Sequence, residues 1–382
     1  MRKYRVKRCW LTVVLVCVCW QSFAAARVAI ERVPNGGIQP QIVTDATGTA
    51  HLLYFAGDGK AGDLFYAGRE KGAWTKPVRV NNSEGSAIAI GTIRGGQIAL
   101  GVKGRVHVAW NGSKPLPNSP HKGAPMYYAR LNDDRTAFEP ERDVMRYTGD
   151  LDGGGSVAAD TKGNVYVVWH GHAPKAPAGE AGRAVYVAKS TDGGVTFAPE
   201  IAVNPQPTGT CGCCGLKAFA DASDALYILY RGATEVVNRD EILLVTRDAG
   251  KSFHTLHSDP WKIGTCPMSS AAITRGGERV LTAWETAGQV HLGIVDGGKL
   301  SRVTPPGVEG RRKHPVVATN RNGDILLVWT EGTGWQRGGA LAWQLFDKAG
   351  KPLDERGRQD GVPVWSFAAA YAKPDGSFVV LY

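Results

Sequence analysis

One pattern of hydrophobic and polar positions recurs along the chain. A strand of apolar and small residues is followed by a short polar turn, and then by a second apolar strand that ends in an aromatic residue. The pattern predicts a two-stranded hairpin, because Gly, Asp and Asn favour tight turns whereas β-branched and aromatic residues favour strands. We count seven copies, in residues 40–55, 97–110, 156–169, 216–230, 270–284, 315–329 and 367–382.

Most hairpins are followed by further segments with the pattern of a strand. A third strand is predicted at 63–69, 125–131, 184–190 and 241–247, and a fourth at 197–203. The aromatic ends of successive hairpins lie 45 to 61 residues apart. Four antiparallel strands repeated at such a spacing are typical of a β-propeller blade. The sequence therefore predicts an all-β propeller, with seven blades by this count and six if one hairpin is an elaboration.

The last copy of the repeat lacks outer strands, and the N-terminal end of the array has one strand too many. The seventh copy has only two strands, whereas residues 27–33 form a strand with no hairpin of its own. We expect this N-terminal strand to supply the missing outer strand of the last blade, because closing the ring removes exposed sheet edges. Residues 27–382 are therefore predicted to form a single propeller domain.

Residues 1–26 differ in character from the rest of the chain. Five basic residues precede an apolar run of about ten residues, Leu11 to Trp20, and three alanines end the segment at Ala26. This order is typical of a secretory signal peptide that is cleaved near Ala26. The sequence thus predicts export to the periplasm or the extracellular space. No later apolar run is long enough to span a membrane.

Removal of this segment changes the charge. The chain has 45 Lys and Arg against 35 Asp and Glu, a formal charge of +10, of which five positive charges lie in residues 1–26. The remaining +5 is mild and not concentrated in runs, so we expect no nucleic-acid partner. We also expect a monomer. Gly makes up 49 of 382 residues, about 13% against an average of about 7%, which fits a fold with many tight turns.

Two turns share a more specific pattern. STDGGVTF (190–197) and TRDAGKSF (246–253) both fit Ser/Thr-x-Asp-x-Gly-x-Ser/Thr-aromatic and lie 56 residues apart. In such a turn the Asp accepts backbone N–H bonds, the Gly tolerates a positive φ and the aromatic residue anchors the hairpin. The pattern assigns a structural role to Asp192, Gly194, Phe197, Asp248, Gly250 and Phe253.

These turns resemble the Asp-box, or BNR, repeats of the sialidase superfamily of β-propellers. The resemblance implies that the boxes are structural and lie on the face opposite the functional site. That site would be built from the segments that lead into the innermost strands and from the loops after the second strands. We call this end of the propeller the mouth. Polar residues that converge on a propeller axis form the default ligand site.

The same resemblance implies a glycan ligand, although the chain departs from the sialidase pattern at one position. Sialidases carry an Arg-Ile-Pro motif on the first inner strand, and its Arg grips a substrate carboxylate, whereas this chain has Ile38-Gln39-Pro40-Gln41. If the protein is a glycoside hydrolase, the candidate catalytic residues are Asp152, Glu285, Arg231 and Arg311. The candidate ligand-binding residues are Gln39, Arg94, His314, Trp335 and Arg337. A glycan or another anionic small molecule, bound or hydrolysed, is the expected partner.

Four cysteines remain after residues 1–26 are removed. Cys211, Cys213 and Cys214 precede the fourth hairpin and Cys266 precedes the fifth, so all four are expected at the mouth. This Cys-x-Cys-Cys stretch resembles that of a subgroup of exported sialidase-like BNR proteins. The resemblance implies no particular activity.

Three interpretations of the cysteines remain open. An even number of cysteines in an exported protein favours disulfides, with Cys266 paired to a member of the triplet. Soft thiolates beside His170 and His172 would also suit copper or zinc. A redox-active thiol pair is the third interpretation, and it requires a lowered thiol pKa. The alternative to a glycan function is therefore a disulfide-stapled or metal-binding scaffold for a protein or small-molecule partner.

Overall fold

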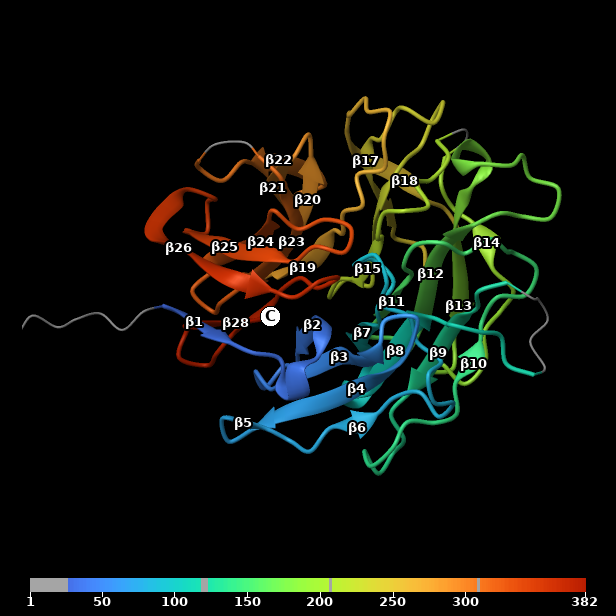
Figure 1. The fold of residues 1–382 in the computed structure, drawn as a ribbon, viewed down its shortest axis with the longest axis horizontal. Coiled ribbons are helices and arrows are strands. Elements are labelled where there is room, and N and C mark those ends of the chain that lie inside the picture. Colours follow the sequence, from blue (N-terminus) through green and yellow to red (C-terminus); the bar gives the residue numbers. More distant parts are fainter. Residues whose placement is uncertain (1–26, 118–122, 206–207, 308–309) are drawn as a thin grey trace, which may run out of the picture.

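The fold is described by a computed structural model of residues 27–117, 123–205, 208–307 and 310–382, and the predicted signal peptide lies outside these residues. Seven β-sheets are arranged as blades around a central axis (Figure 1). The regular helices described are three single 3₁₀ turns, η1 (Pro34–Gly36), η2 (Val102–Gly104) and η3 (Glu180–Gly182). The prediction of an all-β propeller with seven blades is thus confirmed.

The strands of each blade follow one another from the axis outward. The innermost strands are β2 (Ile38–Thr44), β7 (Gln97–Leu100), β11 (Ser156–Ala159), β15 (Lys217–Ala220), β19 (Ala272–Gly276), β23 (Arg312–Thr319) and β27 (Ala369–Ala372). The second strands are β3 (Ala50–Asp58), β8 (Val106–Asn111), β12 (Val165–Gly171), β16 (Leu226–Arg231), β20 (Arg279–Thr286), β24 (Ile325–Glu331) and β28 (Phe378–Leu381).

The outer half of each blade is less regular in length. The third strands are β4 (Ala61–Glu70), β9 (Met126–Arg130), β13 (Ala184–Ser190), β17 (Glu241–Thr246), β21 (Gln289–Asp296), β25 (Gly339–Phe346) and β1 (Val28–Glu31). The fourth strands are β5 (Ala73–Trp74) with β6 (Val78–Arg79), β10 (Arg142–Asp143), β14 (Ile201–Ala202), β18 (His254–Asp259), β22 (Lys299–Val303) and β26 (Pro352–Val362). The strand predicted at 197–203 is therefore reduced to the two residues of β14.

The N-terminal strand closes the ring, as the sequence predicts. β1 is the outermost strand of the last blade and runs parallel to β28, with Val28 opposite Phe378 (Figure 1). The blade has three strands in the described residues, in the order β1-β28-β27. Glu31 of β1 also forms a bidentate ion pair with Arg69 of β4, at 2.6 and 3.0 Å, which ties the last blade to the first.

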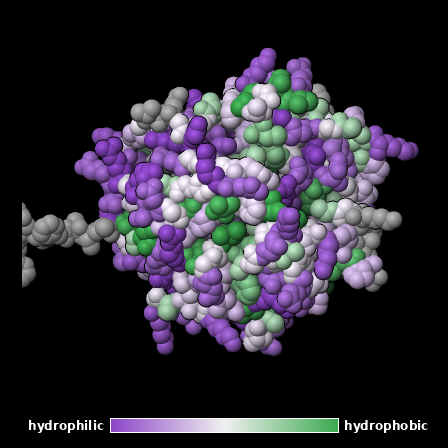
Figure 2. All heavy atoms as spheres, viewed as in Figure 1, coloured by the Kyte–Doolittle hydropathy of each residue, from purple (hydrophilic) through white to green (hydrophobic). Residues whose placement is uncertain are grey.

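The hydrophobic core lies between neighbouring blades. The aromatic residues that end the second strands, such as Trp110, Trp169 and Trp284, are among the largest fully buried side chains. Each packs with strands of an adjacent blade, for example Trp110 with residues of both β3 and β8. Hydrophilic residues cover much of the viewed face, and hydrophobic groups are visible near its centre and at its upper edge (Figure 2). The described part of the chain contains no helix of the length and apolarity needed to span a bilayer.

The two Asp-box-like turns have nearly the same hydrogen bonds. Asp192 Oδ1 accepts from the backbone N–H groups of Val195 and Thr196, at 3.0 and 2.9 Å. Asp248 Oδ1 likewise accepts from Lys251 and Ser252, at 2.9 and 3.0 Å. The aromatic residues of the turns pack against the preceding blade, with the ring of Phe197 4.8 Å from that of Tyr128. Each turn therefore fastens a hairpin of one blade to its neighbour.

The glycines of these turns differ in how closely the neighbouring blade approaches. Gly194 and Gly250 both have positive φ, +83° and +87°, but a Cβ at Gly194 would lie 1.9 Å from the Tyr128 hydroxyl whereas one at Gly250 meets nothing nearer than 3.7 Å. Gly194→Ala is expected to lower the free energy of unfolding by about 3 kcal/mol, through backbone strain plus overpacking. Gly250→Ala is the matched control and should cost about 1 kcal/mol, from strain alone. Equal losses in urea unfolding would contradict this account.

Candidate functional site

The propeller axis contains a cavity of about 950 Å³. It is lined by the innermost strands of all seven blades, from their first residues to the turns that lead into the second strands. None of the residues that the sequence analysis assigns to a ligand, catalytic or metal site lines this cavity. The predicted site residues instead surround the mouth, where the innermost strands begin.

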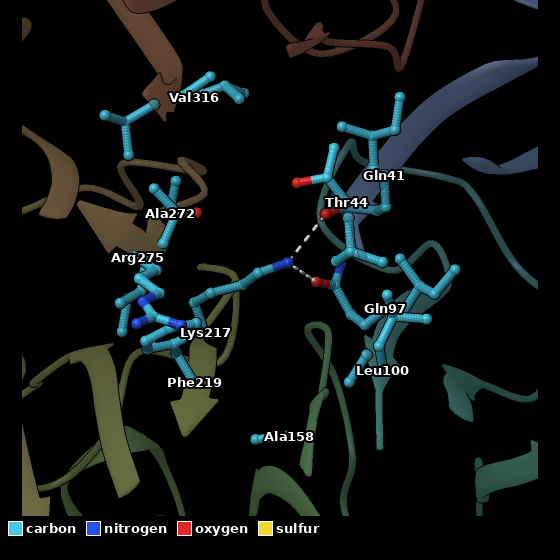
Figure 3. A pocket seen from close by; sticks show the side chains of 18 of the residues that line it. Gln41, Thr44, Gln97, Leu100, Ala158, Lys217, Phe219, Ala272, Arg275 and Val316 are labelled. Atoms are coloured by element: carbon cyan, nitrogen blue, oxygen red, sulfur yellow. Dashed lines mark hydrogen bonds between the residues drawn. The ribbon is translucent and has the colours of Figure 1, made fainter. Parts of the chain in front are cut away.

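Lys217 reaches across the axial cavity from β15 (Figure 3). Its ammonium donates to the side-chain carbonyl oxygen of Gln41 on β2, at 2.8 Å, and to that of Gln97 on β7. No ion pair involving Lys217 is found among the described residues. Burial without a counter-charge lowers the pKa of Lys217 to about 8. The sequence signal is the one charged residue in the apolar stretch Leu216 to Ala220.

The backbone has unusual conformations where the innermost strands begin, in the segments that lead into them and, at Gln39 and His314, within the first three residues of the strands. A non-glycine residue has a positive φ in six of the seven segments, and the fourth blade has Gly209 there, at +58°. The six are Gln39 (+52°), Thr92 (+71°), Asp150 (+61°), Met268 (+51°), His314 (+50°) and Trp365 (+58°). Such conformations cost free energy and cluster at functional sites. The mouth is therefore the part of the molecule in which strained backbone is concentrated.

Gln39 occupies the place where the sialidase resemblance leads us to expect an arginine. Its side chain is buried, and its amide nitrogen donates to the carbonyl oxygens of Ala89, at 2.5 Å, and Trp365, at 2.8 Å. Its backbone N–H donates to Ser366 Oγ at 3.1 Å. Gln39 therefore joins the leading segments of three blades and points no donor toward solvent.

Arg94 and Asp152 form an ion pair at the mouth. Arg94 Nη2 lies 2.5 Å from Asp152 Oδ1, and Arg94 Nε donates to the backbone oxygen of Asp152 at 2.6 Å. The Asp152 side chain is 44% exposed, so the pair is open to a ligand. A Cβ at Gly91 would lie 3.0 Å from Arg94 Nη1 and 3.1 Å from the ring of Trp335. Gly91 thus leaves room for a tryptophan of the sixth blade close to Arg94.

Trp335 is the most exposed large hydrophobic side chain of the described residues, at 54%. It follows β24 and meets Trp365, which precedes β27, with ring centroids 6.4 Å apart and planes at 61°. Arg337 shares the Trp335 loop, is exposed, and has no ion pair within the described ranges. Arg311 is also exposed, and its backbone oxygen accepts from Gly332 in that loop. These residues form one surface. Trp335 and Trp365 make an aromatic platform, and Arg337 and Arg311 are the cations beside it that are unpaired in the described residues.

Arg231, a predicted catalytic residue, lies beneath this surface. It pairs with Glu241 at 2.9 Å, and the two side chains are only 2% and 4% exposed. Arg231 also donates to the backbone oxygens of Arg239, at 2.7 Å, and Glu285. The Glu285 side chain is itself buried, and burial raises the pKa of its carboxyl. The structure therefore places Arg231 and Glu285 in the interior and Asp152 and Arg311 at the surface.

The three candidate histidines make separate contacts. His170 is fully buried, and burial beside Arg183 lowers its pKa to about 4. His172 contacts Gly179 O at 2.7 Å and Asp150 Oδ2 at 3.2 Å. His314 contacts the Ser270 hydroxyl at 3.1 Å, and burial lowers its pKa to about 3, so its ring is neutral. No histidine belongs to the clusters of possible metal ligands found in the described residues.

The four cysteines do lie at the mouth, but as thiols. Cys211 Sγ is 3.3 Å from both Cys213 Sγ and Cys214 Sγ, and no sulfur pair among the described cysteines is at disulfide distance. The predicted disulfide to Cys266 is therefore not formed. Burial opposes ionisation of the Cys214 thiol, but hydrogen bonds from the other two thiols and the charge of Arg231 hold its pKa below the ordinary value.

Two residues that the sequence analysis did not single out connect these parts. Glu180 accepts from the N–H of Gly212 at 2.8 Å and pairs with Arg239 at 2.5 Å. Arg183 donates to the backbone oxygen of Asp150 and packs against Gly212. Both lie in the long polar loop after the third hairpin. Their charge in this loop is the only feature of the sequence that could have pointed to them. They bind the loop that precedes β15 to the third blade.

Comparisons with known proteins agree with the fold. No protein-family model matches the chain, and no curated protein matches it. Among solved structures, the Hadza microbial sialidase Hz136 matches with a TM-score of 0.52 and 12% identity over 84% of this chain and 70% of that one. The Penicillium chrysogenum alpha-L-arabinanase complexed with arabinobiose matches with a TM-score of 0.50 and 13% identity over 84% and 95%. The chain thus has the propeller fold found in a sialidase and in another glycan-active protein.

Proposed function

We propose that the protein is an exported propeller whose mouth binds a glycan that carries a carboxylate. The observation that carries the proposal is the exposed Trp335, held against Trp365 beside the Arg94–Asp152 pair. Aromatic rings offer a flat apolar surface to the C–H face of a sugar, and a guanidinium binds a carboxylate with charge-assisted hydrogen bonds. The unpaired Arg337 in the Trp335 loop supplies that guanidinium.

The choice of a glycan also draws on the two solved structures, one a sialidase and the other complexed with arabinobiose. The polar part of the surface supports the same ligand class. Asp152 Oδ1 is occupied by Arg94, which leaves Oδ2 to accept from sugar hydroxyls. Gln39 does not replace the missing sialidase arginine as a carboxylate ligand, since its amide donors bind backbone oxygens.

Trp335→Ala tests the aromatic platform. With sialyllactose as the acidic glycan and lactose as the neutral one, isothermal titration is expected to show an affinity for sialyllactose about 10-fold lower in the variant, a loss of ~1.4 kcal/mol. Arg337→Gln should remove the preference for sialyllactose over lactose. Ile201→Ala, which removes an exposed apolar side chain on β14, is the control and should leave binding unchanged. Equal binding by Trp335→Ala and the unaltered chain would overturn the proposal.

Hydrolysis is a separate question, and a fluorogenic sialoside addresses it. Glycoside hydrolysis needs a carboxylic acid and a second carboxylate or another nucleophile about the anomeric carbon. Asp152 is the exposed candidate for the acid, whereas Glu285 is buried. Turnover that is abolished in Asp152→Asn would show an enzyme. Binding without turnover would show a lectin-like propeller.

A further inference from the structure

A three-sulfur cluster lies in the turn between β14 and β15. Cys211, Cys213 and Cys214 share this turn, and their sulfur atoms lie within 4.8 Å of one another. The turn is held by backbone hydrogen bonds, from Cys211 N to Arg231 O at 2.9 Å and from Gly215 N to Ser269 O at 3.0 Å. Three sulfurs presented by four consecutive residues are close enough to contact one common ion, and the glycan site proposed above does not use them.

The cluster is buried on the side of Cys211 and Cys214 and accessible to solvent on the side of Cys213. Cys211 and Cys214 are 1% and 2% exposed and pack with Ala233, whereas Cys213 is half-buried. A hydrophobic shell of this kind protects a metal–thiolate centre from solvent. Cys213 provides the side from which an ion can enter.

Three guanidinium groups lie close to the cluster. Arg231 interacts with Cys214, and Arg239 interacts with Cys211 and Cys213. Arg183 lies against Gly212, where an added Cβ would be 3.2 Å from its guanidinium carbon. Thiolates are the form that binds metals, so an ion that binds here has to displace the proton of each ligand that is still a thiol. Three arginines thus lie around a turn that presents three sulfur atoms to one position.

The number of sulfurs points to one kind of ion. Thiolate sulfur is a soft ligand that selects Cu(I), Zn(II) or an iron–sulfur cluster. Structural Zn(II) sites are almost always four-coordinate. Here Cys266 and the Glu180 carboxylate are grouped with Cys213 but not with the full triplet. The complete set is therefore three sulfurs, which suits the trigonal coordination that Cu(I) accepts.

We propose that Cys211, Cys213 and Cys214 bind one Cu(I) ion through three thiolate sulfurs. Each ligand that is protonated in the free protein gives its thiol proton to water as its Cu–S bond forms. No electron transfer is involved, since copper enters and remains as Cu(I). Cys266 lies outside this set.

The test is an anaerobic titration of the reduced protein, residues 27–382, with Cu(I), in competition with a chromophoric Cu(I) chelator. One ion per chain is expected, with only sulfur in the first shell by X-ray absorption. Cys213→Ser should weaken Cu(I) binding by more than ~100-fold, beyond the 10–100-fold that loss of an outer partner costs. Cys213 is half-buried, so this variant is the one expected to fold, and Cys211→Ser is the second. Thermal unfolding verifies the fold of both.

Cys266→Ser is the matched control, and its Cu(I) affinity should equal that of the unaltered chain. A parallel titration with Zn(II) separates the two metals. Tighter binding of Zn(II) that is lost in Cys266→Ser would replace the proposal by a four-ligand zinc site. The Cu(I) proposal is overturned if the reduced, unaltered protein binds Cu(I) no more tightly than the Cys213→Ser variant does. In residues 27–382, denatured without reduction, fewer than four reactive thiols would show a disulfide, and that result would also overturn the proposal.

Discussion

Arg231→Met is expected to lower the free energy of unfolding by about 3–5 kcal/mol, because it leaves the Glu241 carboxylate buried without its partner. The variant also loses the hydrogen bonds from the guanidinium to the backbone oxygens of Arg239 and Glu285. Urea unfolding at neutral pH measures the loss. The same substitution distinguishes an internal ion pair from a ligand-binding arginine, since only the former predicts a large change in the unliganded protein.

A double variant supplies the control for this experiment. Arg231→Met combined with Glu241→Leu removes both charges, and replacing a buried ion pair by apolar residues is often close to neutral. The double variant should therefore recover most of the lost stability. Arg231→Met with unchanged unfolding but impaired glycan binding would contradict the position of Arg231 in the interior.

Lys217→Met is expected to raise the free energy of unfolding at pH 7 by about 1–3 kcal/mol, because the half-buried lysine is desolvated in the axial cavity and has no carboxylate partner in the described residues. The folded pKa of about 8 lies below the ordinary 10.5. Between these values the unfolded state binds more protons than the folded state, so the stability of the unaltered protein should rise with pH there and level off above. The methionine variant should lack this rise.

Thermal unfolding across pH 7 to 11 measures both effects. Lys103→Met is the matched control, because Lys103 lines the same cavity but is exposed. Its stability should follow the pH dependence of the unaltered chain. An alkaline rise that persists in Lys217→Met would show that another group is responsible.

The repeating strands could be predicted because their signal is local. Alternation of apolar and polar residues, with Gly and Asp turns, identifies each hairpin without knowledge of the others. The β13 strand illustrates this, since its predicted residues 184–190 agree with the observed Ala184–Ser190. The β14 strand was overestimated because only Ile201 and Ala202 pair with β13. The parallel orientation of β1 could not be predicted, since no turn connects it to β28.

The site was predictable only where its residues are close in sequence. The cysteine cluster lies within four residues, and its place at the mouth follows from the blade pattern. Arg94 of the second blade and Trp335 of the sixth blade both lie close to Gly91, and no local pattern reveals this proximity. Likewise, the sequence shows Arg231 and Glu285 near strand ends but not that they turn inward. Burial of a charged side chain depends on partners such as Glu241 that tertiary packing selects.

The seam between β1 and β28 has a consequence for the time course of folding. Val28 is paired with Phe378, so this contact joins residues at nearly opposite ends of the sequence. Contacts with such a separation are slow to form, because much of the chain must be ordered before they contribute. Six blades can assemble from adjacent strands, but the seventh has to wait until its final strand has been synthesised. Closure of the whole ring therefore depends on a strand of four residues.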